Sequence, residues 1–264
     1  MKKGFWIILS MFFIPPVTFA GNMKLHYDRP AEYFEEALVI GNGTMGATLY
    51  GGVKKDKIPF NDITLWTGEP ESENSSPDAF NVIPEIRALL DNEDYQGADK
   101  AQYKVQGHYS ENYQPLGTLT IEYLDDTAGI SDYHRWLDIG NATARTQYLM
   151  DGNLFMSDYS ASDPDSVSVI SLKSENKEGI HASLSFDSPL PHSSQVADNE
   201  ISVEGYAAYH SFPVYYKAED KHRYDPERGI HFKTLVRVLN VDGSVKNRYS
   251  DSRIEIDGST EALI

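Results

Sequence analysis

The sequence contains no cysteine among its 264 residues. Neither a disulfide framework nor a cysteine that could carry a lipid anchor is therefore available, and any fold must be held by its own core. Apolar residues make up 40% of the chain, which is enough for such a core and atypical of a disordered protein. The length suits one large β-domain or two small domains.

Basic residues are scarce, because 23 Lys and Arg stand against 40 Asp and Glu, giving a formal net charge of −17. A surface this acidic repels phosphate backbones, so the composition argues against nucleic acid as a partner. Neutral glycans feel no such repulsion and stay compatible with the charge.

The apolar stretch from Phe5 to Ile14 is too short to span a bilayer as a permanent helix. It follows Lys2 and Lys3, and the small residues that a signal peptidase recognises end at Ala20. This pattern predicts a secretory signal peptide over residues 1–20, cleaved after Ala20. We therefore expect a protein of the bacterial periplasm or cell exterior, with no membrane attachment after cleavage.

Most of the remaining chain shows the period-two alternation of half-buried strands. Residues 180–187 are the clearest example, with apolar and polar side chains in strict alternation. Many short alternating runs separated by Gly, Asp and Ser turns predict a mainly β fold, a large antiparallel β-sandwich. The expected strands cover residues 37–40, 47–53, 118–123, 145–150, 154–160, 167–173, 180–187, 201–204, 230–239 and 253–257.

A small helical insert is expected near residues 77–103. Ile83, Ile86, Leu89 and Leu90 fall on one face of a first helix, and a second helical piece follows over residues 92–103. Ser76 or Asp78 is expected to cap the first helix, and Pro84 is compatible only with its first turn.

Residues 41–46 match the dinucleotide-binding pattern G-x-G-x-x-G. Such a site needs the third glycine to open a helix, whereas the continuation here contains adjacent Gly51 and Gly52 and favours a strand. The glycines instead predict a tight turn between two strands. Asn42 in this turn either bonds to its own backbone, as Asn commonly does in turns, or presents a polar side chain to a ligand.

The sequence offers no pattern for a catalytic, cofactor or metal site. The eight histidines are scattered singly, without the spacing of metal ligands, and the G-x-S-x-G nucleophile motif is absent. A glycosidase needs two carboxylates at a defined separation, which the sequence does not locate. Trp66 is the aromatic residue of most interest, because it either packs on the edge of the sandwich or stacks on a sugar.

Five segments in order resemble one family, the family 95 glycoside hydrolases of the α-L-fucosidase type. The opening run YFEEALVIGNGTMGA is similar to the family's first signature, and NDITLWTG to its second. The segments are residues 33–47, 61–68, 84–90, 113–119 and 133–138. The family usually carries an arginine where Thr44 stands, so a substrate contact made by that arginine in relatives would be weakened here.

The resemblance implies an N-terminal β-sandwich over residues 21–264, which in relatives precedes an (α/α)6 catalytic barrel. Members cleave terminal α-L-fucose, and in some cases α-L-galactose, and their catalytic residues belong to the barrel. No segment of this chain resembles that barrel, and we expect the chain to be truncated at its C-terminus, leaving an unpaired strand edge.

Three functions stay open from the sequence. The first is an accessory domain of an exported fucosidase-like hydrolase that acts on fucosylated glycans; the domain is inactive alone and packs on the catalytic barrel, with a separately encoded barrel as one candidate partner. The second is a free-standing carbohydrate-binding protein, and the third is a nonfunctional gene remnant. Asn42, Thr44 and Trp66 are the residues expected to face carbohydrate.

Overall fold

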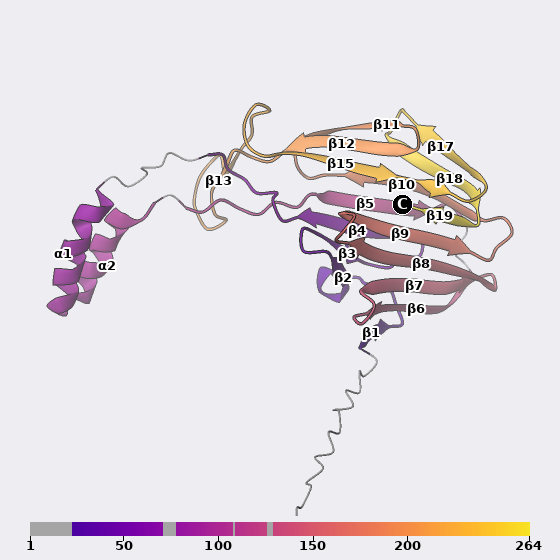
Figure 1. Cartoon of the computed structure of the whole chain (residues 1–264), viewed down its shortest axis with the longest axis horizontal. Helices are drawn as coiled ribbons and strands as arrows, with labels where there is room; N and C mark the ends of the chain where they lie inside the picture. The colour runs from indigo at the N-terminus through magenta and orange to yellow at the C-terminus, as the bar shows by residue number, and fades with distance from the viewer. Residues whose placement is uncertain (1–22, 71–77, 108, 126–128) are drawn as a thin grey trace, which may run out of the picture.

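The structure is a computed structural model that describes residues 23–70, 78–107, 109–125 and 129–264. It is a sandwich of antiparallel sheets with a helical hairpin at one end (Figure 1). The predicted signal peptide and its cleavage site lie outside the described residues. No helix among the described residues is long and apolar enough to cross a membrane.

One layer contains a seven-stranded sheet and a three-stranded sheet, which both face the second layer. In spatial order the strands of the larger sheet are β1 (Lys24–Tyr27), β6 (Ile130–Asp138), β7 (Thr143–Met150), β8 (Asn153–Ser162), β9 (Val167–Ser174), β19 (Glu261–Leu263) and β16 (Leu239–Asn240). The smaller sheet consists of β11 (His192–Ala197), β12 (Glu200–Tyr206) and β15 (His231–Arg237).

The second layer is a single seven-stranded sheet. Its order is β17 (Ser244–Arg248), β18 (Arg253–Ser259), β10 (Ile180–Asp187), β5 (Gly117–Tyr123), β4 (Lys55–Asp62), β3 (Met45–Leu49) and β2 (Leu38–Gly41). Two short strands, β13 (His210–Ser211) and β14 (His222–Arg223), pair at the end of the molecule from which the hairpin projects (Figure 1). The predicted β-sandwich is confirmed.

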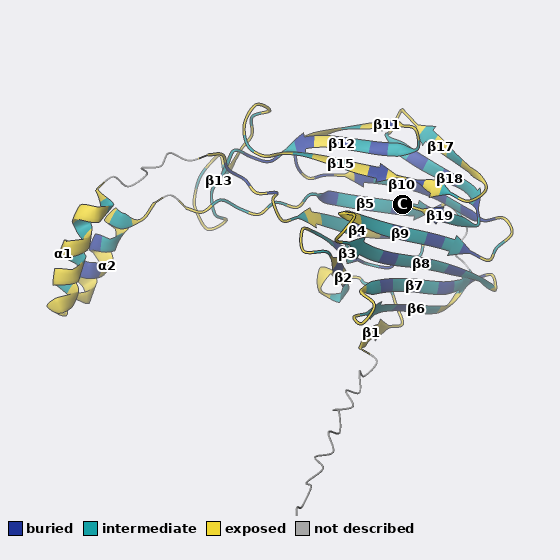
Figure 2. Cartoon of the chain, viewed as in Figure 1, coloured by how far each residue is buried: buried dark blue, intermediate teal, exposed yellow. Residues whose placement is uncertain are grey.

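The alternation in the sequence becomes the core between the layers. In β10 the side chains of Ile180, Ala182, Leu184 and Phe186 are buried, and β5 alternates in the same way (Figure 2). Each of these strands therefore contributes one apolar face to the core and one polar face to solvent, as the period of two requires.

Charged groups are also buried in this core, and each has partners. Asp56 of β4 accepts hydrogen bonds from the Tyr159 hydroxyl at 2.6 Å and from the Gly52 N–H at 2.9 Å, and so joins the two layers. Because burial disfavours the charged form, the pKa of Asp56 is raised to about 6.

Arg135 of β6 is 1% exposed and holds the segment that enters the sandwich. Its guanidinium donates to the carbonyls of Arg29 at 2.7 Å and Glu36 at 2.9 Å, and it lies over the ring of Tyr27. The short helix η1 (Phe34–Glu36) is thereby fixed against the sheet. Burial lowers the pKa of Arg135 from its usual value.

The helical insert is confirmed as α1 (Ala79–Asp91), α2 (Tyr95–Gln102) and a turn of 3-10 helix, η2 (Tyr103–Val105). The first helix starts after Asp78, whose side chain makes no capping bond. The restriction of Pro84 to the first turn was wrong, because Pro84 is the sixth residue of α1. Pro84 cannot donate to the Phe80 carbonyl, but both residues are exposed, so the lost hydrogen bond leaves no polar group buried in a core.

The glycine-rich segment is a turn, as expected. Gly41 ends β2, Gly43 has a φ of +94°, and Met45 begins β3, so the chain reverses between two strands and no helix follows. The dinucleotide-binding pattern is therefore a coincidence of spacing.

Candidate functional site

Asn42 and Thr44 form one hydrogen-bonded unit at the turn between β2 and β3. The Asn42 Oδ1 accepts from the N–H of Thr44 at 3.1 Å, its hydroxyl at 3.0 Å and the Met45 N–H at 2.8 Å. The Asn42 Nδ2 donates to the Ser162 carbonyl at 2.9 Å. Since the amide is engaged at both ends, the turn-forming interpretation of Asn42 agrees with the geometry.

The same turn is linked to Trp66 through one residue. The Ile63 N–H donates to the Thr44 carbonyl at 2.9 Å, and the Trp66 indole N–H donates to the Ile63 carbonyl at 3.0 Å. The three residues predicted from the sequence therefore lie on one end of the sandwich, although Trp66 is 22 residues or more from the other two.

Exposed apolar side chains gather around Trp66. The indole is 43% exposed, Ile63 is 56% exposed, and the ring of Tyr113 packs edge-on against Trp66 with 5.5 Å between centroids. An isolated β-bridge joins Trp66 to Tyr113 and fixes both rings. We name Ile63, Trp66 and Tyr113 the aromatic rim.

Polar groups border the aromatic rim. Asp62 accepts from the backbone N–H of Thr64 at 2.8 Å and from its hydroxyl at 2.6 Å. Partial burial, together with the negative charge of Asp62, raises the pKa of the Tyr113 hydroxyl above its usual value. The rim thus combines flat apolar surface with a neutral hydroxyl and a carboxylate, a composition that suits a neutral polyhydroxylated ligand.

A second cluster, which the sequence did not reveal, lies beside the rim. Glu111 accepts hydrogen bonds from the Thr67 hydroxyl and from the Ser211 N–H at 2.9 Å, and it pairs with the Nδ1 of His210 at 2.8 Å. Thr67 follows Trp66 directly, and its N–H donates to the Asn112 carbonyl. Because His210 and Ser211 lie 99 and 100 residues from Glu111, no local spacing signals this cluster.

Ser211 and His222 resemble a nucleophile and its base, with 2.8 Å between the Ser211 Oγ and the His222 Nδ1. Ser211 is only 1% exposed, however, and the carboxylate of Glu111 contacts the Ser211 backbone and His210 instead of His222. A buried hydroxyl cannot attack a glycan, so these bonds clamp the β13–β14 pair to the rim.

Two further features concern the potential metal ligands and the buried carboxyl among the described residues. No group of three His, Cys, Asp or Glu side chains that could hold a metal ion occurs among them. The carboxyl with the raised pKa, Asp56, lies in the core and is 1% exposed, so a glycan cannot reach it. The aromatic rim, in contrast, is exposed at the end of the sandwich.

The fold and the rim define a β-sandwich domain with an exposed aromatic surface at one end. A family model described as "Glycosyl hydrolase family 65, N-terminal domain" matches residues 25–264. The chain belongs to this family of N-terminal domains, and the N-terminal domain recognised from the five sequence segments is confirmed.

Curated relatives carry fucosidase names. Alpha-L-fucosidase 2 of Arabidopsis thaliana is 27% identical over 249 residues, which cover 92% of this chain and 29% of the relative. "Probable alpha-fucosidase A" of Aspergillus niger is 29% identical over 205 residues, covering 72% of this chain and 25% of the relative. This chain thus spans less than a third of the length of these relatives. The chain is therefore a glycoside hydrolase N-terminal domain that is similar to part of these fucosidases.

Proposed function

We propose that this chain is the accessory domain of an exported fucosidase-like hydrolase that acts on fucosylated glycans. The domain packs on a catalytic domain supplied elsewhere, in a longer polypeptide or by a separately encoded barrel, and is not catalytic alone. The aromatic rim is the observation that carries this proposal, because it presents an exposed indole on a hydrogen-bonded turn.

The rim supports a role at the edge of an active site. Trp66 offers a flat apolar face to the C–H face of a sugar, while Asp62 and Tyr113 supply polar groups next to it. The helical hairpin projects from the same end of the sandwich (Figure 1). Its exposed apolar side chains, among them Phe80 at 81% and Leu90 at 47% exposure, suit burial against another domain.

The activity test uses the purified chain and a fucosylated oligosaccharide. We expect no release of fucose from the chain alone, because Asp56 is buried in the core and Glu111 is engaged by Thr67, His210 and Ser211, which leaves no acid among the described residues paired with Asp62 at the rim. Release of fucose at a rate abolished by a single carboxylate substitution within the chain would contradict the accessory role.

A second candidate function, a free-standing glycan-binding protein, is favoured by the same exposed indole. Titration with fucosylated glycans distinguishes free-standing binding from the accessory role. Binding that is lost in Trp66→Ala and kept in Tyr95→Ala, an exposed aromatic on the hairpin, supports free-standing binding. No binding by the unaltered chain at millimolar ligand removes this function and leaves the accessory role.

Export is part of the proposal and has its own test. The chain is expressed in a bacterium, and the periplasm and medium are separated from the cytoplasm. We expect the exported protein to begin at Gly21, the residue that follows the predicted cleavage site. Uncleaved protein confined to the cytoplasm would contradict export. The proposed role of the aromatic rim would be unaffected, because it does not depend on export.

A further inference from the structure

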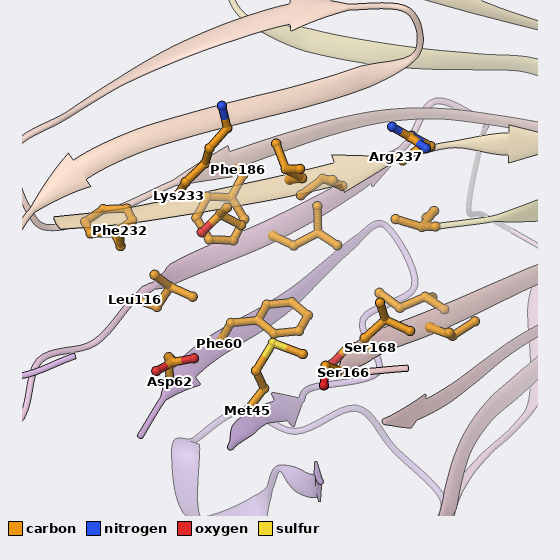
Figure 3. Close-up of a pocket in the computed structure, with 18 of the residues that line it drawn as sticks. Met45, Phe60, Asp62, Leu116, Ser166, Ser168, Phe186, Phe232, Lys233 and Arg237 are labelled. Atoms are coloured by element: carbon orange, nitrogen blue, oxygen red, sulfur yellow. The ribbon is translucent and has the colours of Figure 1, made fainter. Parts of the chain in front are cut away.

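An apolar groove lies in the layer that contains Ile264, between β9 and β15. Its volume is about 640 Å³. Figure 3 looks into it: Ser168 of β9 lies on one side, Phe232 of β15 on the other, and Met45 and Phe60 of the opposite layer lie between them. The groove is therefore open on the outer face of one layer, and its floor is formed by side chains of the opposite layer.

The last strand of the structure leads into this groove. The Ile264 N–H donates to the Ile170 carbonyl at 2.8 Å, and the Ile170 N–H donates to the Ile264 carbonyl at 2.9 Å. Strand β9 extends further, through Val169 to Val167, and there it pairs only with β8 among the described strands. Because bonding directions alternate along an antiparallel strand, the N–H and carbonyl of Ser168 point to the open side.

The facing edge, β15, is open as well. Strand β15 is the outermost strand of its three-stranded sheet. The Val238 N–H donates to the Asn199 carbonyl at 2.9 Å, on the β12 side. By the same alternation the N–H groups of Arg237 and Leu235 point the other way, into the groove. Two strand edges that lack a partner among the described strands therefore face each other across the cavity.

The registers on the two sides agree. On one side Leu263 pairs with Ser171, and on the other it pairs with Leu239. Continuing both ladders places the second residue beyond Ile264 between Ser168 and Val236. Its side chain points inward, in phase with Val236 and with the partly buried Ile264. One strand can thus pair with both edges at once.

Two buried hydroxyls in the groove lack partners. The Ser168 Oγ and the Thr234 Oγ1 are shielded from solvent and make no hydrogen bond with any described residue, and both side chains line the cavity. Buried polar groups in native proteins are nearly always paired. These hydroxyls therefore indicate that something with hydrogen-bonding groups, such as a peptide backbone, occupies the groove.

We propose that the groove is the seat of one extended β-strand that continues β19 beyond Ile264, antiparallel to both β9 and β15. Its apolar side chains fall at every second residue, starting with the second. The strand joins the seven-stranded and three-stranded sheets into one continuous layer. The Ile264 backbone is already paired with Ile170 of β9, so a strand that continues β19 directly enters the groove without a turn.

The test lengthens the chain at Ile264 by the hexapeptide Thr-Val-Thr-Val-Thr-Val. The matched control carries Val-Thr-Val-Thr-Val-Thr, which has the same composition but turns the apolar residues to the outside. In the in-phase chain we expect a higher Tm and at least about tenfold slower exchange of the amide hydrogens of Ser168, Leu235 and Arg237. The control is expected to give less than half of both effects.

A third chain has proline at the second added position of the in-phase hexapeptide. It loses the N–H that bonds the Ser168 carbonyl, and its protection of Leu235 and Arg237 is expected to fall with it. Equal protection by both phases, or none by either, overturns the proposal. Protection by the free hexapeptide but not by the fused one also overturns it, because the groove would then accept a strand from a separate chain.

Discussion

The sandwich and the helical hairpin are built on opposite principles, although both belong to one chain. The sandwich buries apolar faces from two layers and even encloses Asp56 and Arg135, each with partners from distant parts of the sequence. The first helix of the hairpin, α1, buries no residue, and α2 buries only Ala98 and Ala101 (Figure 2). The sandwich is therefore stabilised by its own core. The hairpin projects from it and keeps exposed apolar surface that is available for packing against another domain.

The largest expected contrast comes from one substitution made in both regions. Leu184→Ala, at a side chain that is fully buried, is expected to lower the free energy of unfolding by about 3 kcal/mol through lost burial and a cavity. Leu90→Ala, at a side chain that is 47% exposed, should cost less than about 1 kcal/mol. Urea unfolding measures both. Equal losses would show that the hairpin and the sandwich share one core.

The next contrast concerns pH and the buried carboxyl. The folded-state pKa of Asp56, about 6, lies above its value of 3.8 in the unfolded chain, so the folded state holds the proton more tightly. The contribution of Asp56 to the free energy of unfolding is therefore greatest below pH 4. It falls by about 3 kcal/mol as the pH rises from 4 to above 6.

We expect Asp56→Asn to remove this fall, so that the difference in unfolding free energy between the two chains changes with pH over this range. Measuring the difference cancels the exposed carboxylates, which contribute with the opposite sign. Glu85→Gln, on the hairpin, is the control and should leave the pH profile unchanged. A pH-independent difference for Asp56→Asn would contradict a raised pKa.

A smaller effect is expected at the buried guanidinium. Arg135→Met keeps much of the length but leaves the carbonyls of Arg29 and Glu36 without their donors, which should cost about 2 kcal/mol. Arg87→Met, at an exposed position of α1, should cost less than about 0.5 kcal/mol. Thermal unfolding of the two variants checks the contrast. If both lose the same stability, Arg135 is not a specific clamp on the entering segment.

The smallest expected loss of stability comes from removing a helix cap, and it should be confined to the hairpin. Asp94 caps α2 by accepting from the Gly97 N–H at 2.9 Å, so Asp94→Ala should destabilise that helix by about 1 kcal/mol. Hydrogen exchange should quicken in α2 and stay unchanged in β5 and β10. Asp99→Ala, inside the same helix, removes no cap and should not quicken exchange. Faster exchange in the sandwich after Asp94→Ala would mean that the two regions are coupled.

Prediction from the sequence succeeded where the signal is local. The alternation of residues 180–187 indicated a half-buried strand, and the helical spacing of residues 77–103 indicated the insert; both are present as β10 and as α1 and α2. The order of five short motifs identified the family, because the identity of each residue in a motif is visible without the fold. These features depend on neighbours within a few positions.

Strands β4 and β6 escaped prediction because each buries a charged residue. Asp56 interrupts the apolar pattern of β4, and its partner Tyr159 is 103 residues away. Arg135 does the same in β6, with a partner 106 residues away. The candidate site behaved in a similar way: the sequence marked Asn42, Thr44 and Trp66, but the link through Ile63 and the Glu111 cluster needed contacts between distant segments.

By itself, the sequence determined the class of fold, the helical insert and the family, since side-chain periodicity and motif identity are properties of short segments. Only the tertiary structure decided which charges are buried, that the hairpin stands outside the core, and that β9 and β15 face each other across an apolar groove. The physical reason is that burial, strand edges and cavities arise from the packing of segments about a hundred residues apart. The sequence of one segment does not specify which distant segment will pack against it.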